Sequence, residues 1–193
     1  MIGPKTAGQP YVVGRVHINA KEMMEYINPI QAVISRRFLN NSKFSLRRAS
    51  GEDIDFIFQV RAQSMKNDFT RTYGWNDDEQ YKRAADEIGQ AQIIMAGKEP
   101  VGFIKVLTRE HELHLHQMQI LPRYQGFGIG TALVQCVLDR ADSQNLPVTL
   151  FVLKGARSRN LYDRMGFSVI EENIYNFKMC RIPDSGKRSD EAL

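Results

Sequence analysis

The spacing of hydrophobic residues along the chain alternates between the period of a strand and the period of a helix. Apolar residues three and four positions apart predict helices that begin at Ser50, at Asp77, at Ile129 and near Arg157. Short apolar or alternating runs predict strands at residues 44–48, 91–96, 101–107, 113–121, 148–153, 167–171 and 174–181. The predicted order is strand, helix, helix, three strands, helix, strand, helix and two strands.

This order predicts an α/β (α+β) fold. Strands joined by short turns pair in antiparallel fashion, whereas the strand–helix–strand unit at 113–153 predicts one parallel crossover. We therefore expect a mixed, mostly antiparallel sheet of six or seven strands with helices on both faces.

Two helix boundaries and one connection are predicted in more detail. Ser50 and Asp53 have the spacing of a capping box, so the first helix of the domain is expected to start there. The second helix is expected to run from Asp77 to Ile88. The polar and aromatic stretch 70–75, which contains Tyr73-Gly74-Trp75, is expected to connect the two.

The two ends of the chain differ from its middle. Residues 1–43 form an N-terminal extension with a loose start and a partly helical stretch at 19–41, which Pro29 should break or kink. Residues 182–193 are polar and are expected to be a disordered tail. The folded domain is therefore placed at 44–181, and the extension either packs on it or serves an interface.

Composition narrows the class of protein. The chain has 193 residues, of which 42% are hydrophobic and 25% are charged, which is ordinary for a single globular domain. No apolar run approaches the roughly 20 residues of a membrane span, and the start lacks the pattern of a secretory signal. Cys136 and Cys180 offer neither a disulfide framework nor metal-ligand spacing. A cytoplasmic enzyme without a metal is the expectation.

Charge does not favour a nucleic acid partner. The net charge of +4 is mildly basic, but the chain contains no zinc-finger spacing, no basic helix and no long run of like charges. A phosphate-rich cofactor favours local positive charge equally well. Nucleic acid binding therefore rests on charge alone.

The glycine-rich segment Gln125–Thr131 connects a predicted strand to a predicted helix. Backbone N–H groups in such a turn lie at the positive end of the helix dipole, where phosphate binds. The segment lacks the third glycine of a Rossmann fingerprint, since Thr131 occupies that position, and it lacks the lysine of a P-loop. A tight turn that needs small residues is the structural alternative.

Three motifs together resemble the GNAT superfamily of N-acetyltransferases. The first is Q-x-x-G-x-G, formed by Gln125, Gly128 and Gly130. It is preceded by the strand end Met118-Gln119-Ile120-Leu121-Pro122, and it is followed by Leu161-Tyr162-x-x-x-Gly166-Phe167. The three occur in the order and at the separation of that family, over residues 44–181.

The resemblance implies acetyl-CoA as co-substrate and places its binding groups. Main-chain groups of Met118 and Ile120 would bind the pantetheine arm, next to a bulge that splays this strand from strand 148–153. Tyr162 would protonate the leaving thiolate. Pyrophosphate would be bound by the backbone of Gln125, Gly126, Phe127, Gly128, Ile129, Gly130 and Thr131.

The general base and one coenzyme contact are less clearly implied. His114 and His116 lie two residues apart on one strand, so both should face the same side; His116, nearer the cleft, is the candidate base, and a purely structural role is the alternative. Many family members carry an asparagine where this chain has Gly155 or Ala156. Ser158 or Asn160 would then replace that contact.

The predicted function is therefore direct transfer of an acetyl group from acetyl-CoA to a primary amine of a small molecule or a peptide. Tyr73-Gly74-Trp75 falls where this fold usually shapes the acceptor pocket. The alternative is a non-catalytic acyl-CoA-binding or interaction module. Neither nucleic acid nor membrane is an expected partner, and a homodimer is left open.

Overall fold

The computed structural model describes residues 11–13, 16–18 and 44–184. Within it, β1 (Tyr11–Val13) and β2 (Val16–Ile18) form a separate antiparallel pair. The helical stretch predicted at 19–41 and most of the predicted tail lie outside the described residues. No helix in the described part of the chain has the length and apolar character needed to cross a membrane.

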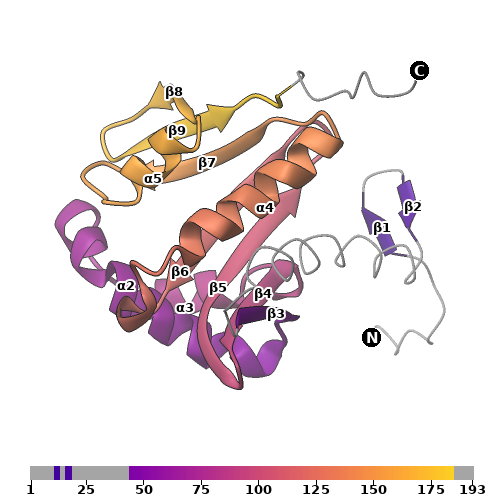
Figure 1. Cartoon of the computed structure of the whole chain (residues 1–193). Helices are drawn as coiled ribbons and strands as arrows, with labels where there is room; N and C mark the ends of the chain where they lie inside the picture. Colours follow the sequence, from indigo (N-terminus) through magenta and orange to yellow (C-terminus); the bar gives the residue numbers. More distant parts are fainter. Residues whose placement is uncertain (1–10, 14–15, 19–43, 185–193) are drawn as a thin grey trace, which may run out of the picture.

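The domain is built on one open, seven-stranded mixed sheet, as predicted (Figure 1). Its strand order is β3-β4-β5-β6-β7-β9-β8, in which only β6 and β7 are parallel neighbours. The strands are β3 (Phe44–Arg48), β4 (Ala91–Ala96), β5 (Glu99–Thr108), β6 (Leu113–Ile120), β7 (Val148–Leu153), β8 (Ser168–Glu172) and β9 (Asn176–Arg181).

Helices cover both faces of the sheet, and each face has its own hydrophobic core (Figure 1). Helix α4 (Ile129–Ser143) and the short α5 (Arg159–Arg164) pack on one face. Helices α2 (Ile54–Thr72) and α3 (Asp77–Ala85) pack on the other face, over the half that contains β3 to β6. Between β7 and β8 this second face lacks a described helix, so Phe151 is 53% exposed there.

The first helix is tied to the sheet by the predicted capping box. The backbone N–H of Ser50 donates to the carboxylate of Asp53 at 2.8 Å, across the 3₁₀ turn Gly51–Asp53 that precedes α2. Arg47 on β3 donates to both carboxylate oxygens of Asp53, at 2.6 and 2.8 Å. These bonds, the Arg47 contact foremost, lower the pKa of Asp53. A single carboxylate thus fixes where α2 leaves the edge of the sheet.

Both helices on this face end elsewhere than predicted. Helix α2 continues through Thr72, so the start of the predicted connection 70–75 is helical. Helix α3 ends at Ala85 instead of Ile88, because the chain turns at Asp86 and Glu87 takes a left-handed backbone, with φ of 48°. The 3₁₀ turn Ile88–Gln90 then leads into β4. The predicted helix thus extends too far, since Ile88 already belongs to the next turn.

Strand β6 contains a bulge. The bulge changes which side chains of β6 face α4 and which face the helices on the other side of the sheet. Lys105 of β5 pairs with Gln117 and Val106 pairs with Leu115, so His116 is the additional residue. Beyond the bulge, Met118 and Ile120 pack with the core beneath α4. Gln117, paired with the α3-facing Lys105, lies on the opposite face.

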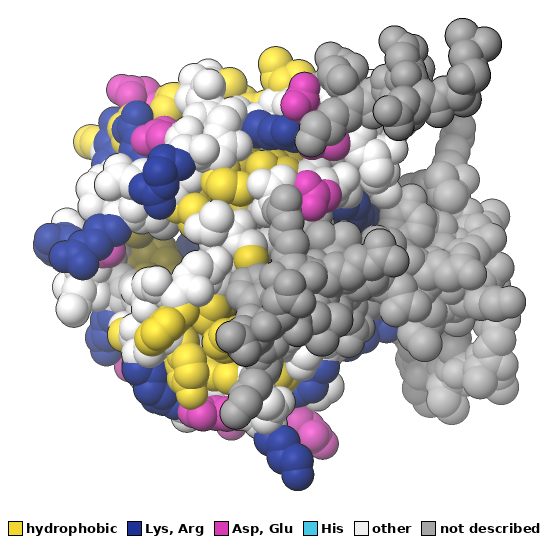
Figure 2. Space-filling model, in the orientation of Figure 1, with side chains coloured by type: hydrophobic (Ala, Val, Ile, Leu, Met, Phe, Trp, Pro, Cys, Tyr) yellow, Lys and Arg dark blue, Asp and Glu magenta, His cyan; other side chains and the backbone are white. Residues whose placement is uncertain are grey.

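The parallel pairing between β6 and β7 ends early. Only Leu113, His114 and Leu115 pair with β7, at Val148–Leu150, although β6 continues to Ile120. The two halves of the sheet therefore separate from the bulge onwards. In Figure 2 the surface is hollowed on the left of the view, between the part that contains α5 and the part that contains α2.

Gly102 allows the close approach of β5 to this part of β6. A Cβ atom at Gly102 would collide with the carbonyl oxygen of Gln119 and lie 3.0 Å from Cα of Ile120. We expect Gly102→Ala to lower the free energy of unfolding by about 3 kcal/mol, because backbone atoms cannot move aside as a side chain can. Urea unfolding followed by circular dichroism measures this. Gly51→Ala, which meets no atom within 4 Å, is the control, and an equal effect of both changes would contradict the close-approach argument.

Candidate active site

The glycine segment forms a turn that leads directly into α4. Gly126 and Gly128 both have left-handed backbones, with φ of 84° and 79°, which explains why glycine occupies these positions. Gly128 is the N-cap residue and has no side chain to satisfy the first N–H groups of α4. The loop and the N-terminus of α4 therefore present backbone donors without a side-chain cap, as phosphate binding requires.

Polar contacts on both sides hold this turn in place. The side-chain amide of Gln125 donates to the carbonyl oxygen of Ile120 at 2.8 Å, so the first residue of the motif anchors the loop to the end of β6. On the other side, Glu99 accepts hydrogen bonds from Arg123 and from the hydroxyl of Tyr124, each at 2.6 Å. Phe127 at the tip is 69% exposed.

The main chain of β6 is directed into the gap at the predicted positions. The N–H of Leu121 donates to Val101 of β5 at 2.8 Å. Because backbone groups alternate in direction along a strand, those of Ile120 and Met118 point to the opposite edge, towards β7. No β7 residue pairs with this edge of the described sheet. The edge is thus open to an added extended group.

Tyr162 is the second residue of the motif Leu161–Phe167 and lies in α5. The residue is 7% exposed, and its ring packs edge-on against Phe167 with centroids 5.7 Å apart. Burial raises the pKa of Tyr162 to about 12. Its hydroxyl makes no hydrogen bond with any other described residue, and it stays protonated at neutral pH.

The two positions at which the resemblance implies an asparagine, Gly155 and Ala156, lie in the turn before α5. Gly155 has a left-handed backbone, with φ of 81°, and asparagine is among the few other residues that tolerate this conformation. Ala156 instead packs against the core. Ser158 and Asn160 are both exposed in the first turn of α5. Their proposed coenzyme contact stays a prediction.

The two histidines lie close together but in different surroundings. Their ring centroids are 5.7 Å apart, as expected for side chains on the same side of β6. His114 is 3% exposed, whereas His116 at the bulge is partly exposed. Burial, followed by the positive charge of Lys105, lowers the pKa of His116, so its imidazole is neutral and free to accept a proton at neutral pH.

His114 belongs to a hydrogen-bonded chain that runs from the interior to the surface at the closed end of the gap. The Thr149 hydroxyl donates its single proton to Glu112 at 3.0 Å, so Nδ1 of His114 must be the donor in its 2.9 Å contact with Thr149. Arg109 in turn donates to Glu112 at 2.6 Å. Burial is the main cause that lowers the pKa of His114 to about 4. This network holds the last paired residues of β6 and β7 together.

Aromatic residues connect the two halves of the sheet at the open end of the gap between β6 and β7. The Tyr73 and Tyr175 rings have centroids 4.5 Å apart, and the side chain of Asn176 donates to the Tyr73 hydroxyl at 2.8 Å. Trp75 lies nearby, T-shaped to Phe69 at 6.0 Å, and donates its indole N–H to Asp77 at 2.6 Å. The predicted acceptor segment thus contacts the turn between β8 and β9.

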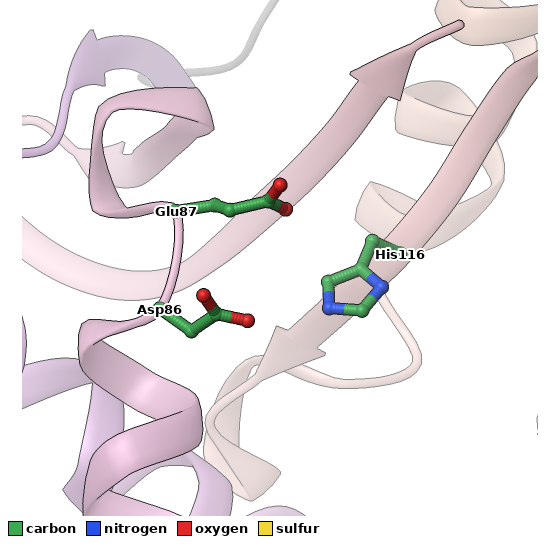
Figure 3. A group of neighbouring side chains, drawn as sticks. All are labelled: Asp86, Glu87 and His116. Atoms are coloured by element: carbon green, nitrogen blue, oxygen red, sulfur yellow. The ribbon is translucent and has the colours of Figure 1, made fainter.

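Sequence reasoning did not anticipate that Asp86 and Glu87, both exposed, lie beside His116. The structure brings both carboxylates to His116, with the ligand atoms of the three side chains within 4.8 Å of one another (Figure 3). The sequence signal, two acids after an amphipathic helix, was hidden because the helix was expected to continue to Ile88. The acids at 77–79 lie at the other end of this helix, in the first turn of α3.

Comparison with known protein families identifies the class of this protein. The model of the acetyltransferase (GNAT) domain matches residues 60–183. The chain therefore belongs to the GNAT acetyltransferases, the family that its three motifs resemble. A comparison with curated proteins finds no match.

Solved structures show the same fold at low sequence identity. The PaiA N-acetyltransferase of Thermoplasma acidophilum, in complex with coenzyme A, is 16% identical over 72% of this chain and 98% of its own, with a TM-score of 0.59. The ribosomal-protein-S18-alanine N-acetyltransferase of Escherichia coli is 15% identical over 76% and 98%, with a TM-score of 0.55. Naa50 of Arabidopsis thaliana, in complex with the bisubstrate analogue CoA-Ac-MVNAL, is 20% identical over 72% and 98%, with a TM-score of 0.52.

The depressed pKa of His114 predicts an acid-sensitive fold. The unfolded chain protonates this histidine near pH 6.5, but the folded chain does so only near pH 4, so stability is lost as the pH falls between these values. We expect the wild type to lose about 2 kcal/mol more than His114→Gln between pH 7 and pH 5. Urea titrations at each pH measure this difference. His111→Gln, which removes an exposed histidine, should behave as wild type; equal pH sensitivity of all three proteins would contradict a buried neutral His114.

Proposed function

We propose that this protein transfers an acetyl group from acetyl-CoA directly to the nitrogen of a primary amine. The observation that carries the proposal is the early end of β6–β7 pairing beside a glycine turn whose N–H groups lack a side-chain cap. An extended thioester fits the first feature and a pyrophosphate fits the second. Both groups belong to coenzyme A, and the co-crystallised neighbours contain coenzyme A or an analogue of it.

In the proposed complex, the backbone of residues 125–131 binds the pyrophosphate. The pantetheine arm then lies along the open edge of β6, where the main chain of Met118 and Ile120 faces the gap. The N–H of Ile120 is well placed to donate to the oxyanion that develops on the acetyl carbonyl, since the Ile120 carbonyl already bonds to Gln125. The acetyl group would thereby lie near the bulge at His116.

The acid and base roles fall to Tyr162 and His116. Aminolysis of a thioester requires a neutral amine as nucleophile and a proton for the departing thiolate. His116 is a neutral, partly exposed imidazole next to the gap, which suits a base. Tyr162 keeps its proton at neutral pH and has no competing hydrogen-bond partner among the described residues, which suits an acid.

The acceptor would approach from the α2–α3 side, between Tyr73 and Tyr175 at the open end and His116 at the bulge. Naa50 and the S18-alanine N-acetyltransferase carry peptide or protein acceptors in their names, and they share only the fold with this chain. Both peptide and small-molecule amines are therefore within the proposal. We further infer a cytoplasmic enzyme from its ordinary composition and its two separated cysteines, and a homodimer is an open expectation.

A panel of primary amines with acetyl-CoA tests the proposal by following release of free thiol. Gly128→Ala should raise the Kd for coenzyme A about tenfold, because a side chain at φ of 79° strains the turn and redirects its N–H groups. Isothermal titration calorimetry measures this. Gly97→Ala imposes the same kind of strain in the β4–β5 turn, with φ of 61°, and should leave the Kd unchanged. Tight coenzyme binding without thiol release on the whole panel would favour the non-catalytic acyl-CoA-binding module.

Tyr162→Phe tests the acid role. Loss of the hydroxyl should lower kcat about 100-fold with little change in KM for acetyl-CoA, because the proton is needed only as the C–S bond breaks. Thermal unfolding should change little, since the hydroxyl has no described partner. Steady-state kinetics measures the first effect, and Tyr81→Phe, which removes an exposed hydroxyl bonded to Asp55, is the control. Unchanged turnover would exclude Tyr162 as the acid.

A further inference from the structure

Phe151 is the first residue of β7 beyond its pairing with β6. That pairing ends where Leu115 meets Leu150, so Phe151 and His116 lie on the two sides of the point at which the strands separate. We call this point the fork. The Phe151 ring packs edge-on against His114 with centroids 5.7 Å apart, and the rings of His114 and His116 are also 5.7 Å apart. The three rings therefore share one face of the sheet.

This face lies on the side of α2 and α3. Leu150 and Val152 pack in the core beneath α4, and because side chains alternate along a strand, Phe151 and Leu153 point the other way. No described helix covers this part of the sheet, and Phe151 is 53% exposed. Phe151 and Leu153 thus form an apolar strip that leads from the fork towards the open end of the gap.

Tyr73 lies at the far end of the apolar strip. Leu153 pairs with Asn176 of β9, and the Asn176 side chain donates to the Tyr73 hydroxyl at 2.8 Å. Tyr175 packs on Tyr73 with ring centroids 4.5 Å apart. From Phe151 to Leu153 the strand advances about 7 Å. The strip therefore matches the length of a phenyl ring on a two-carbon linker, and Tyr73 limits anything longer.

Two other occupants fit the apolar strip less well. A second copy of the chain would need roughly 800 Å² per partner for a stable interface, far more than the side chains of Phe151 and Leu153 present. A second cationic group of the acceptor would lie beside Lys178, which pairs with Phe151 from β9 and forms an ion pair with Glu171 at 3.9 Å. Placing a charge over apolar surface next to a like charge costs free energy.

We propose that Phe151 determines acceptor specificity, and that the acceptor is a primary amine with an apolar group of phenyl size on a short carbon linker. This inference rests on the proposed acetyl transfer. The amine nitrogen would lie at the fork beside His116, and the apolar group would cover Phe151 and Leu153. Removing that group from water supplies binding free energy that a short alkyl amine lacks.

Steady-state kinetics on the full chain tests the assignment with ethylamine, 2-phenylethylamine and 1,4-diaminobutane. We expect kcat/KM for 2-phenylethylamine to exceed that for ethylamine about 30-fold. Phe151→Ala should raise the KM for 2-phenylethylamine about 20-fold with kcat little changed, because an apolar contact far from the reacting bond acts equally in the ground and transition states. The KM values for ethylamine and acetyl-CoA should stay within about twofold of wild type.

Three further variants separate specificity from stability. Phe151→Leu keeps an apolar side chain and should raise the KM for 2-phenylethylamine only about threefold. Tyr73→Ala removes the end of the strip and should favour 4-phenylbutylamine over 2-phenylethylamine about tenfold more than wild type does. The matched control is Ile182→Ala, which removes a 77% exposed apolar side chain directly after β9 at the closed end and should leave all these ratios unchanged.

Peptide amides distinguish the two sources of this acceptor chemistry. A peptide with phenylalanine as its first residue carries the same apolar group as 2-phenylethylamine, and the same peptide with glycine first does not. Transfer to the phenylalanine peptide with a higher kcat/KM than to 2-phenylethylamine assigns a peptide acceptor. The reverse order assigns a small arylalkylamine, and both results support the role of Phe151.

The contrary outcomes are distinct. Equal kcat/KM for ethylamine and 2-phenylethylamine, a preference for 1,4-diaminobutane, or an equal effect of Phe151→Ala on all amines overturns the inference while the acetyltransferase proposal stands. A dimer that Phe151→Ala dissociates in analytical ultracentrifugation, with unchanged amine preference, overturns it in favour of an interface. If no amine is acetylated, the proposed function fails; calorimetric titration of 2-phenylethylamine in the presence of coenzyme A then supports the strip only if Phe151→Ala weakens binding about tenfold.

Discussion

The structure depends on one interrupted interaction, the parallel pairing of β6 with β7. Three residue pairs hold the strands together at one end, and the bulge at His116 prevents the ladder from continuing. A strand edge left without a partner exposes backbone donors and acceptors that must be satisfied in another way. In this fold the unsatisfied edge lies inside the sheet, where only a narrow extended group can reach it. The binding of an extended thioester follows from that geometry more directly than from any one side chain.

The gap between β6 and β7 must be supported on both sides. Each half of the sheet is packed against its own helices. Helices α2 and α3 pack on the half from β3 to β6, while α4 and α5 connect β6 with the C-terminal strands on the other face. The chain Arg109–Glu112–Thr149–His114 holds the closed end, and the contact of Tyr73 with Tyr175 joins the halves at the open end. The gap is thereby fixed at both ends.

The sequence predicted the parts of the fold that depend on local chemistry. Val148–Leu153 was assigned without error, because a continuous apolar run between a helix and a turn leaves few alternatives. The sequence also predicts the capping box at Ser50 and the glycine turn before α4, because the roles of these residues are local. Coenzyme-binding positions, catalytic roles and the contacts of Ser158 and Asn160 stay predictions, since no ligand is present to test them.

What the sequence could not show depends on long-range register. A bulge is one additional residue relative to a partner strand, so His116 cannot be recognised as additional before the pairing of Lys105 with Gln117 is known. The corner at Asp86 and Glu87 was missed for a related reason, since a left-handed Glu87 contradicts local preference and is maintained by contacts such as that of Lys105 with Asp86.

The bulge also separates two histidines that the sequence treats as equivalent. His114 lies in the paired region, where Thr149 uses its Nδ1 and burial keeps the ring neutral, so the residue maintains the closed end of the gap. His116 lies where pairing stops, so its ring nitrogens are left to face Asp86 and Glu87 instead of a neighbouring strand. The register of β5 and β6 therefore decides the surroundings of the two histidines, and the bulge that lies where the β6–β7 pairing ends also leaves His116 without a pairing partner.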